Sequence, residues 1–390
     1  MMASHRSANM ADASREDDLA IVLFGGGARA AYQVGLLRWL AAHHPELRFP
    51  IITGVSAGAI NATYLAAHPG NFAEAVSGLT RLWSELELEQ VFRVDPAFFL
   101  GNVLRWGIRL VSGGGPLTPQ VRGLVDTSPL RALLETHLAR SNGEIAGIAE
   151  NLEAGRLKAL AIITSSYSTG QSVAWVQGCA IEDWERAQRR SRRTRMTVDH
   201  VMASAALPIL FPAVPLEDAW YGDGGIRLSS PCSPAIHLGA RRILVISNRY
   251  RKSLEEADQP QVRGYPPPIQ ISGHLLDGFF LDDLDQDALS LKRINELLEE
   301  IPPERRRGLR RVDLLTIRPS RDFGKLAAEF EPRLPFVFRH LVRGLGSRET
   351  VSPDLLSLLL FQRDYVNRLI EIGEADAEAR AEEIHALLEF

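Results

Sequence analysis

The sequence predicts an α/β fold whose central sheet is mostly parallel. Residues 19–24 form a continuous apolar run, which is typical of a strand buried on both faces, and the run ends at three consecutive glycines. Residues 49–53 form a second such run, which leads into a serine turn flanked by glycines. Small and apolar residues at helical spacing follow each loop, at residues 29–42 and 59–67. Two successive units of strand, loop and helix are the pattern of a layered protein with parallel strands.

The rest of the chain adds shorter elements of both kinds. Apolar runs of strand length occur at residues 157–164, 172–176, 241–247 and 312–317. Helical spacing of apolar residues occurs at residues 281–298 and from residue 352 to the C-terminus. Residues 94–126 are rich in glycine and aromatic residues, and they fit an insertion near a site, a lid or a plain surface loop. Residues 259–268 are expected to form a linker because they contain several prolines.

Composition and charge narrow the functional classes. The 390 residues carry 44 basic and 48 acidic side chains, and the resulting net charge of −4 argues against a general nucleic-acid binder. The two cysteines, Cys179 and Cys232, are too few for a disulfide framework. Residues 1–18 are expected to be a disordered tail, since they are polar and lack the apolar core of a signal peptide. No apolar run is long enough for a membrane-spanning helix, so a cytoplasmic protein is expected.

The residues from Gly54 to Gly58 fit the pattern G-x-S-x-G around Ser56. In this pattern a sharp turn from strand to helix strains the serine backbone and exposes its hydroxyl, and the two flanking glycines avoid a collision. The N-terminal end of the following helix favours a developing negative charge. The motif predicts that Ser56 is a nucleophile, and a tightly packed turn is the alternative.

Gly25, Gly26 and Gly27 form a second candidate site. Their N–H groups can hold an anion at the start of a helix, and beside a serine nucleophile that anion is the tetrahedral oxyanion of acyl transfer. The same loop fits a dinucleotide fingerprint, which needs an acidic residue at the end of the second strand. Glu46 has about the required spacing but precedes that strand, so the dinucleotide interpretation is not favoured.

A serine nucleophile needs a base, and Asp223 is the most distinctive candidate. It lies between glycines after a proline-containing apolar segment, and such glycines let the backbone approach another loop. An ordinary Asp-Gly turn is the alternative. The downstream histidines lie in no distinctive loop, and they are His200, His237, His274, His340 and His385.

Four blocks, in order and approximate spacing, resemble the patatin-like phospholipases of bacterial type. They are Gly25-Gly26-Gly27-x-Arg29, Gly54-x-Ser56-x-Gly58, Ala203-Ser204-Ala205-Ala206-Leu207-Pro208 and Asp223-Gly224-Gly225. The resemblance covers about residues 19–248, with one departure at Ala30, where the family often has glycine. It implies a catalytic domain at residues 19–248, followed by a mostly helical extension at residues 249–390 that packs on it.

The resemblance also implies a chemistry. The family fold is a three-layer α/β/α sandwich, and its members cleave acyl esters of lipids without a metal or other cofactor. Ser56 would accept the acyl group, and Asp223 would activate first the serine and then water. The loop of Gly25, Gly26, Gly27 and Arg29 would form the oxyanion hole, mainly through N–H groups around Gly26 and Gly27. An acyltransferase with the same dyad and a non-catalytic lipid-binding regulator are the alternatives.

Further residues bear on contact with lipid. Arg29 would either neutralise a lipid phosphate or pack against its own loop. The six arginines between residues 186 and 195 could meet anionic headgroups of a membrane surface, or they could form a solvated loop or helix face. Residues 355–361 are strongly apolar and are expected to be a buried core or subunit contact rather than a lid, which leaves a homo-oligomer open. The acids Asp283, Asp285 and Asp287 do not form an EF-hand calcium loop, because Ala288 stands where glycine is required.

Overall fold

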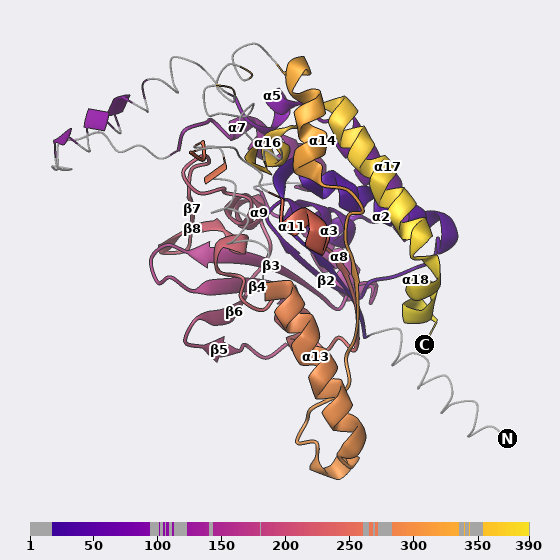
Figure 1. Cartoon of the computed structure of the whole chain (residues 1–390). Coiled ribbons are helices and arrows are strands. Elements are labelled where there is room, and N and C mark those ends of the chain that lie inside the picture. Colours follow the sequence, from indigo (N-terminus) through magenta and orange to yellow (C-terminus); the bar gives the residue numbers. More distant parts are fainter. Residues whose placement is uncertain are drawn as a thin grey trace.

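The computed structural model describes residues 18–93, 123–139, 143–179, 181–259, 283–334 and 354–389, together with short stretches between these ranges. Within them, one mixed sheet of ten strands forms the centre of the molecule (Figure 1). The strand order is β10-β9-β1-β2-β3-β4-β6-β5, and β8 pairs with both β3 and β7. The strands are β1 Leu19–Leu23, β2 Ile51–Val55, β3 Ala159–Ser166, β4 Ser172–Gly178, β5 Glu185–Arg186, β6 Arg189–Arg193, β7 Val214–Leu216, β8 Ala219–Asp223, β9 Arg242–Ile246 and β10 Asp313–Ile317.

The strands from β10 to β3 run parallel, whereas β4 and β8 run antiparallel to β3. Of these strands, β1, β2, β3 and β9 are buried along almost their whole length and are largely apolar, whereas β10 is only partly buried. In β1, Ile21 and Leu23 point into the larger core cluster, and Ala20 and Val22 point into a smaller one on the opposite face. The predicted α/β architecture is confirmed.

Helices cover both faces of the sheet and complete a three-layer α/β/α fold (Figure 1). α10 and α13 contribute to the smaller core cluster, and most of the other helices contribute to the larger one. The described helices are α2 Ala31–His43, α3 Ala57–Ala67, α4 Phe72–Ser84, α5 Leu88–Val91, α7 Ser128–Leu138, α8 Ala146–Glu153, α9 Val198–Ser204, α10 Ser233–His237, α11 Leu254–Ala257, α13 Asp283–Glu300, α14 Phe323–Phe330, α16 Asp354–Leu359, α17 Arg363–Ala379 and α18 Ala381–Leu388. Two short 3-10 turns matter for the site, namely η1 Gly27–Ala30 and η2 Gly224–Arg227.

The C-terminal residues share this sheet and its core. β10 extends the sheet beside β9, and α17 lies along α2 (Figure 1). The two helices approach closely at Gly35, where a Cβ atom would lie 1.9 Å from the carbonyl oxygen of Ile370. In the same contact the Tyr32 hydroxyl donates a 3.0 Å hydrogen bond to the Asp376 carboxylate. α17 therefore braces the helix that follows the glycine loop.

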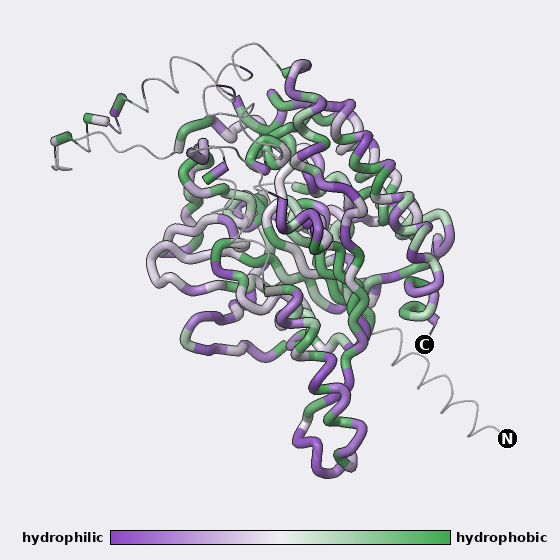
Figure 2. Tube along the Cα trace, in the orientation of Figure 1, coloured by the Kyte–Doolittle hydropathy of each residue, from purple (hydrophilic) through white to green (hydrophobic). Residues whose placement is uncertain are grey.

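Two sequence expectations need correction. The helix expected at residues 29–42 begins as the 3-10 turn η1, and regular α-helix starts only at Ala31. The arginine-rich segment is neither a loop nor a helix face but the hairpin β5–β6, whose second strand pairs with β4 at the edge of the sheet. Figure 2 shows this hairpin in mostly hydrophilic colours, against the hydrophobic central strands.

Some expectations fall on parts of the chain that the structure does not describe. The N-terminal tail, most of residues 94–126 and much of the proline-bearing linker lie outside the described residues. His274 and His340 lie outside them as well.

Candidate active site

Ser56 lies at the junction of β2 and α3, where the chain turns sharply. Its backbone has φ 56° and ψ −132°, and a positive φ strains a residue that is not glycine. The turn is crowded, because a Cβ atom on Gly58 would lie 2.2 Å from the carbonyl oxygen of Leu23. A Cβ atom on Gly54 would lie 2.6 Å from the carbonyl oxygen of Gly58. The turn that presents Ser56 thus requires both glycines.

Asp223 ends β8 and meets Ser56 from 167 residues farther along the chain. Ser56 Oγ donates a 2.6 Å hydrogen bond to Asp223 Oδ2. The second carboxylate oxygen, Oδ1, accepts a 2.9 Å hydrogen bond from the Gly225 N–H. Both side chains are buried. A hydroxyl held against a carboxylate in this way can be activated as a nucleophile.

Burial dominates the electrostatics of Asp223. It raises the pKa of the carboxyl group from its ordinary value of 3.8 to about 7, because the charged form loses its hydration. The hydrogen bonds from Ser56 and Gly225 oppose this shift, since they stabilise the carboxylate. A base with a pKa near neutrality can both accept and return a proton at neutral pH.

The glycine loop passes directly beside Ser56. A Cβ atom on Gly25 would lie 2.6 Å from the Ser56 Cβ, so only glycine fits there. Asn248 fixes the loop from behind, because its Nδ2 donates to the carbonyl oxygens of Phe24 at 3.1 Å and Gly25 at 2.9 Å.

Two N–H groups of the loop remain available. Within the described part of the chain, the N–H groups of Gly26 and Gly27 donate to no other main-chain or side-chain atom. Gly27 lines the same cavity as Ser56. The loop beside Ser56 therefore carries two N–H groups that have no acceptor among the described residues.

Arg29 does not act as part of this donor set. Its N–H already donates a 3.0 Å hydrogen bond to the Gly26 carbonyl oxygen. Its buried guanidinium group contacts α16, with donor–acceptor distances of 2.6 Å to Ser357 Oγ and 2.8 Å to Asp354 Oδ1. The sequence left a lipid phosphate or its own loop as the partner of Arg29, whereas the structure shows the guanidinium group bonded to α16. Arg29 ties the glycine loop to the C-terminal part of the chain.

Ser204 is a supporting residue that the motif analysis did not assign. Its hydroxyl accepts a 2.9 Å hydrogen bond from the Ser56 N–H and donates one of 2.6 Å to the Ile163 carbonyl oxygen. It therefore holds the strained turn against β3. The sequence offered one signal for Ser204, namely its position in the third block that resembles the family. Asn248, which fixes the glycine loop, lies in none of the four blocks.

Replacing Ser204 with alanine should slow the reaction of Ser56 without removing it. The Ser56 N–H and the Ile163 carbonyl would both lose a buried partner, and a lost buried hydrogen bond costs about 1–3 kcal/mol. We expect labelling of Ser56 by a fluorophosphonate to slow about tenfold or more. Thr63→Ala is the matched control, since Thr63 is also buried and bonds only within α3. Equal labelling rates for the two variants would contradict this role.

Three of the described histidines form contacts with residues other than Ser56. His200 is in α9, where its Nδ1 lies 2.9 Å from the Thr197 hydroxyl, and burial lowers its pKa to about 4. His237 stacks on Trp184, and His385 lies against Trp39 and His44. None of these three rings is hydrogen-bonded to Ser56.

An apolar cavity opens beside Ser56. It spans about 580 Å³, part of which is open to solvent, and its wall is almost entirely hydrocarbon. The lining residues are Gly27, Ser56, Ala57, Ile60, Leu82, Trp83, Leu86, Val91, Leu130, Leu133, Leu134, Ala205, Leu207, Phe211 and Phe361. Phe361 comes from the C-terminal apolar segment expected to be buried, so that segment completes the wall.

Comparison with known proteins assigns the chain to a family. The family model described as patatin-like phospholipase matches residues 21–236, which is more than half of the chain. The chain belongs to the patatin-like phospholipase family. This membership makes it one of a family of lipid acyl hydrolases. No curated protein sequence matches this patatin-like chain in a direct search.

Solved structures similar to this patatin-like chain come from bacteria and humans. VipD from Legionella pneumophila aligns with a TM-score of 0.41 and 13% identity over 94% of this chain and 67% of its own. Human GIVD cytosolic phospholipase A2, in complex with methyl gamma-linolenyl fluorophosphonate, aligns with a TM-score of 0.45 and 15% identity. That alignment covers 96% of this chain and 59% of the human one, so this chain spans about three fifths of its length. The type III effector ExoU aligns with a TM-score of 0.36 and 15% identity over 94% of this chain and 53% of its own.

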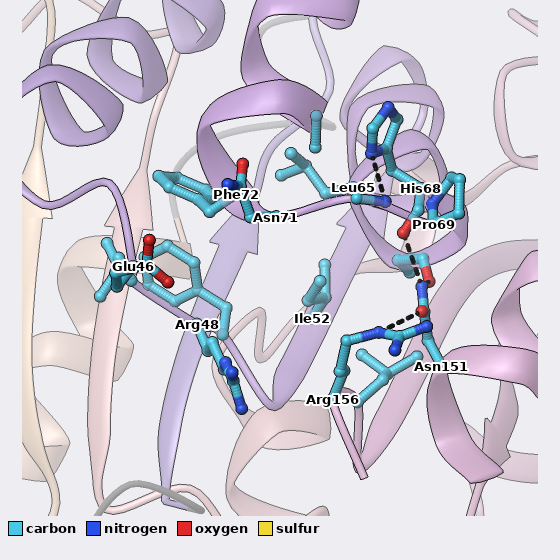
Figure 3. A pocket seen from close by; sticks show the side chains of 16 residues that line it. Glu46, Arg48, Ile52, Leu65, His68, Pro69, Asn71, Phe72, Asn151 and Arg156 are labelled. Carbon is cyan, nitrogen blue, oxygen red and sulfur yellow. Dashed lines mark hydrogen bonds between the residues drawn. The ribbon is translucent and has the colours of Figure 1, made fainter. Parts of the chain in front are cut away.

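A larger cavity of the patatin-like chain lies elsewhere, near Phe49 and Ile52 of the β2 segment (Figure 3). It spans about 910 Å³, part of which is open to solvent. Several of its polar groups are bonded to one another, since Arg156 Nε donates to Asn151 Oδ1 and His68 Nδ1 accepts the Gly70 N–H. It brings no hydroxyl or thiol against a base, so we place the candidate active site at Ser56.

Neither a metal centre nor a membrane span is found in the part of the chain that the structure describes. No three histidine, cysteine, aspartate or glutamate side chains there gather closely enough to hold a metal ion. Asp285 pairs with Arg318, and Asp287 accepts the Cys232 N–H. No described helix is both long and apolar enough to cross a bilayer.

Proposed function

We propose that this protein hydrolyses acyl esters of lipids through a dyad of Ser56 and Asp223. The observation that carries the proposal is the 2.6 Å hydrogen bond from Ser56 Oγ to Asp223 Oδ2 beside an apolar cavity. Family membership supports lipid as the substrate class. Phospholipids, lysophospholipids and neutral acyl esters are the substrates to test.

Acylation begins when Asp223 accepts the Ser56 hydroxyl proton. Ser56 Oγ attacks the ester carbonyl carbon, and the carbonyl electron pair moves to oxygen to form the tetrahedral oxyanion. The free N–H groups of Gly26 and Gly27 are the donors available to stabilise this charge. The C–O bond to the alcohol then breaks, and the alcohol leaves with the proton that Asp223 returns.

Deacylation repeats the same steps with water. Asp223 accepts a proton from water, and the hydroxide attacks the acyl-enzyme carbonyl carbon. The tetrahedral intermediate collapses, the acid leaves, and Ser56 Oγ regains its proton from Asp223. One carboxyl group serves both half-reactions because its pKa lies near neutrality.

Mass spectrometry with a fluorophosphonate and a panel of esters tests this proposal. We expect a single covalent adduct on the peptide that contains Ser56. We also expect release of free fatty acid from at least one lipid in a panel that varies headgroup and chain length. An adduct elsewhere, or no turnover of any acyl ester, would contradict the proposal, and the second result would favour a non-catalytic lipid binder. Transfer of the acyl group to an added alcohol at the expense of water would instead assign a transacylase.

The cavity should set the preferred chain length. Ile60 lines it and is partly exposed, so Ile60→Phe can narrow it without overpacking the core. We expect kcat/KM for long-chain esters to fall about tenfold or more, while short-chain esters are hydrolysed as before. Ile294→Phe on the exposed surface of α13 is the control. An equal loss for both chain lengths would show that the acyl chain binds elsewhere.

A further inference from the structure

A pocket of a different character lies between the hairpin β5–β6 and the segment that follows Asp223. Part of its space is open to solvent. Its polar lining is rich in arginine and serine, namely Arg189, Arg190, Arg227, Ser229, Ser230 and Ser233. Arg189 and Arg190 belong to β6, whereas Arg227 ends η2. Two elements distant in sequence thus both contribute basic residues to the lining of one cavity.

Two of these guanidinium groups carry buried nitrogen atoms that lack a partner. Arg189 Nη1 and Arg190 Nε are both shielded from solvent and form no hydrogen bond in the described structure. A buried cationic donor without an acceptor is costly, because its lost hydration is not replaced. An acceptor that enters the pocket would therefore restore an interaction the protein itself does not provide.

The arginines in and near the hairpin differ in whether they form an ion pair. Arg192 pairs with Glu217, and Arg195 pairs with Glu144. By contrast, no ion pair joins Arg189, Arg190 or Arg227 to any residue that the structure describes. Within the described residues, these three arginines are thus not neutralised by a direct ion pair.

Asp287 offsets part of the positive charge at Arg189. The pKa of the Arg189 guanidinium is lowered first by burial and then by the charge of Arg186, and Asp287 opposes the shift. The Asp287 carboxylate accepts the Cys232 N–H, and Asp183 accepts a 3.3 Å hydrogen bond from Ser191. The pKa of His237 is lowered by burial and then by Arg186 and Arg189, so its ring adds no positive charge at neutral pH.

We propose that this pocket binds a phosphate group, carried by a lipid headgroup or by a small soluble compound. Phosphate oxygens are acceptors without donors, and they match the planar forks of arginine through paired hydrogen bonds. The serine hydroxyls can donate to the remaining oxygens. The site lies next to the segment of Asp223, and the inference does not depend on the catalytic role of Ser56.

Binding measurements on the full chain test the proposal. The Ser56→Ala variant serves as background, so that no lipid is hydrolysed during the experiment. The soluble probes are inorganic phosphate and glycerol phosphate, followed by calorimetry. The lipid probes are vesicles of phosphatidylcholine with and without phosphatidic acid, followed by flotation. Arg189→Gln, Arg190→Gln and Arg227→Gln each remove one pocket cation, and Arg193→Gln removes an equal charge from an exposed position of the same strand outside the pocket.

We expect each pocket variant to weaken binding about tenfold or more, since a charge-assisted hydrogen bond is lost, and Arg193→Gln to bind as the parent does. Binding of the soluble probes identifies the phosphate itself as sufficient, whereas binding only to phosphatidic acid vesicles identifies a lipid headgroup. Either result supports the pocket. Equal weakening by Arg193→Gln would overturn the proposal and favour a diffuse basic surface. The proposal would also be overturned if none of the probes bound.

A melting curve guards against loss of fold. The pocket variants should melt at or above the temperature of the parent without ligand, because each removes an unpaired cation. If a glutamine variant melts at a lower temperature than the parent, Arg189→Lys and Arg190→Lys replace it in the test. Lysine keeps the positive charge but lacks the planar guanidinium group, so these variants should still weaken phosphate binding. Parent-like binding by both lysine variants would overturn the proposed contact geometry.

Discussion

Ser56→Ala is expected to lower the turnover of acyl esters by about 10⁴-fold or more, since it removes the atom that accepts the acyl group. Alanine keeps the same backbone turn, so the cavity and the glycine loop should remain in place. Steady-state hydrolysis of the best ester from the panel measures the effect. Fluorophosphonate labelling provides a second measurement, and the adduct should be absent from the variant.

The control for Ser56→Ala is a serine of the same region outside the dyad. Ser165→Ala removes a buried hydroxyl that, among the described residues, donates one long hydrogen bond of 3.4 Å to the Gly224 carbonyl oxygen. Its turnover should stay within about a factor of ten of the parent, since that contact is long and weak. Undiminished labelling of the Ser56→Ala protein would move the nucleophile to another residue.

The central strands and the serine turn could be predicted from the sequence because their signals are local. A strand buried on both faces, such as β1, needs a continuous apolar run, and a turn as tight as the one at Gly58 needs glycine. The same holds for α13, whose apolar residues recur at helical spacing until the prolines that follow it.

Contacts between distant segments could not be predicted in this way. Asp223 became a candidate through its glycines and the family resemblance, and no periodicity places it 2.6 Å from Ser56. The bond from Ser204 to the Ser56 N–H and the anchoring of Arg29 by α16 are equally invisible in spacing. Such contacts depend on how elements pack, and a single sequence carries no pattern for that.

The arginine-rich hairpin shows why local composition can mislead. A run of arginines interrupted by one serine has neither the apolar alternation nor the branched side chains that indicate a strand. β6 forms because β4 offers it an edge to pair with. The hairpin position then turns some of its arginines toward η2 and others toward acidic partners, a division that the sequence alone does not reveal.

Asp223→Asn is expected to abolish turnover and at the same time to stabilise the fold. Asparagine has nearly the same shape and can still accept the Gly225 N–H, but it cannot take the Ser56 proton, so kcat should fall about 10³-fold or more. In the parent, kcat/KM should rise with pH through about 7 as Asp223 ionises. Turnover near the parent level would assign the base to another group.

The stabilising effect of Asp223→Asn should depend on pH in a defined direction. The pKa of Asp223 rises from 3.8 in the unfolded chain to about 7 in the folded protein, so the folded state binds more protons between these values. The stability of the parent therefore falls as pH rises from about 4 to about 7, and the full penalty persists above that range.

Asparagine does not titrate, so its advantage in melting temperature should be small near pH 4 and grow to about 2 °C or more near pH 8. Thermal unfolding of both proteins across this range measures the difference. A variant that melts below the parent near pH 8 would show that the carboxylate is not destabilised by burial. A pH-dependent gain together with lost turnover would show that Asp223 is kept in an unfavourable environment for the sake of its reaction with Ser56.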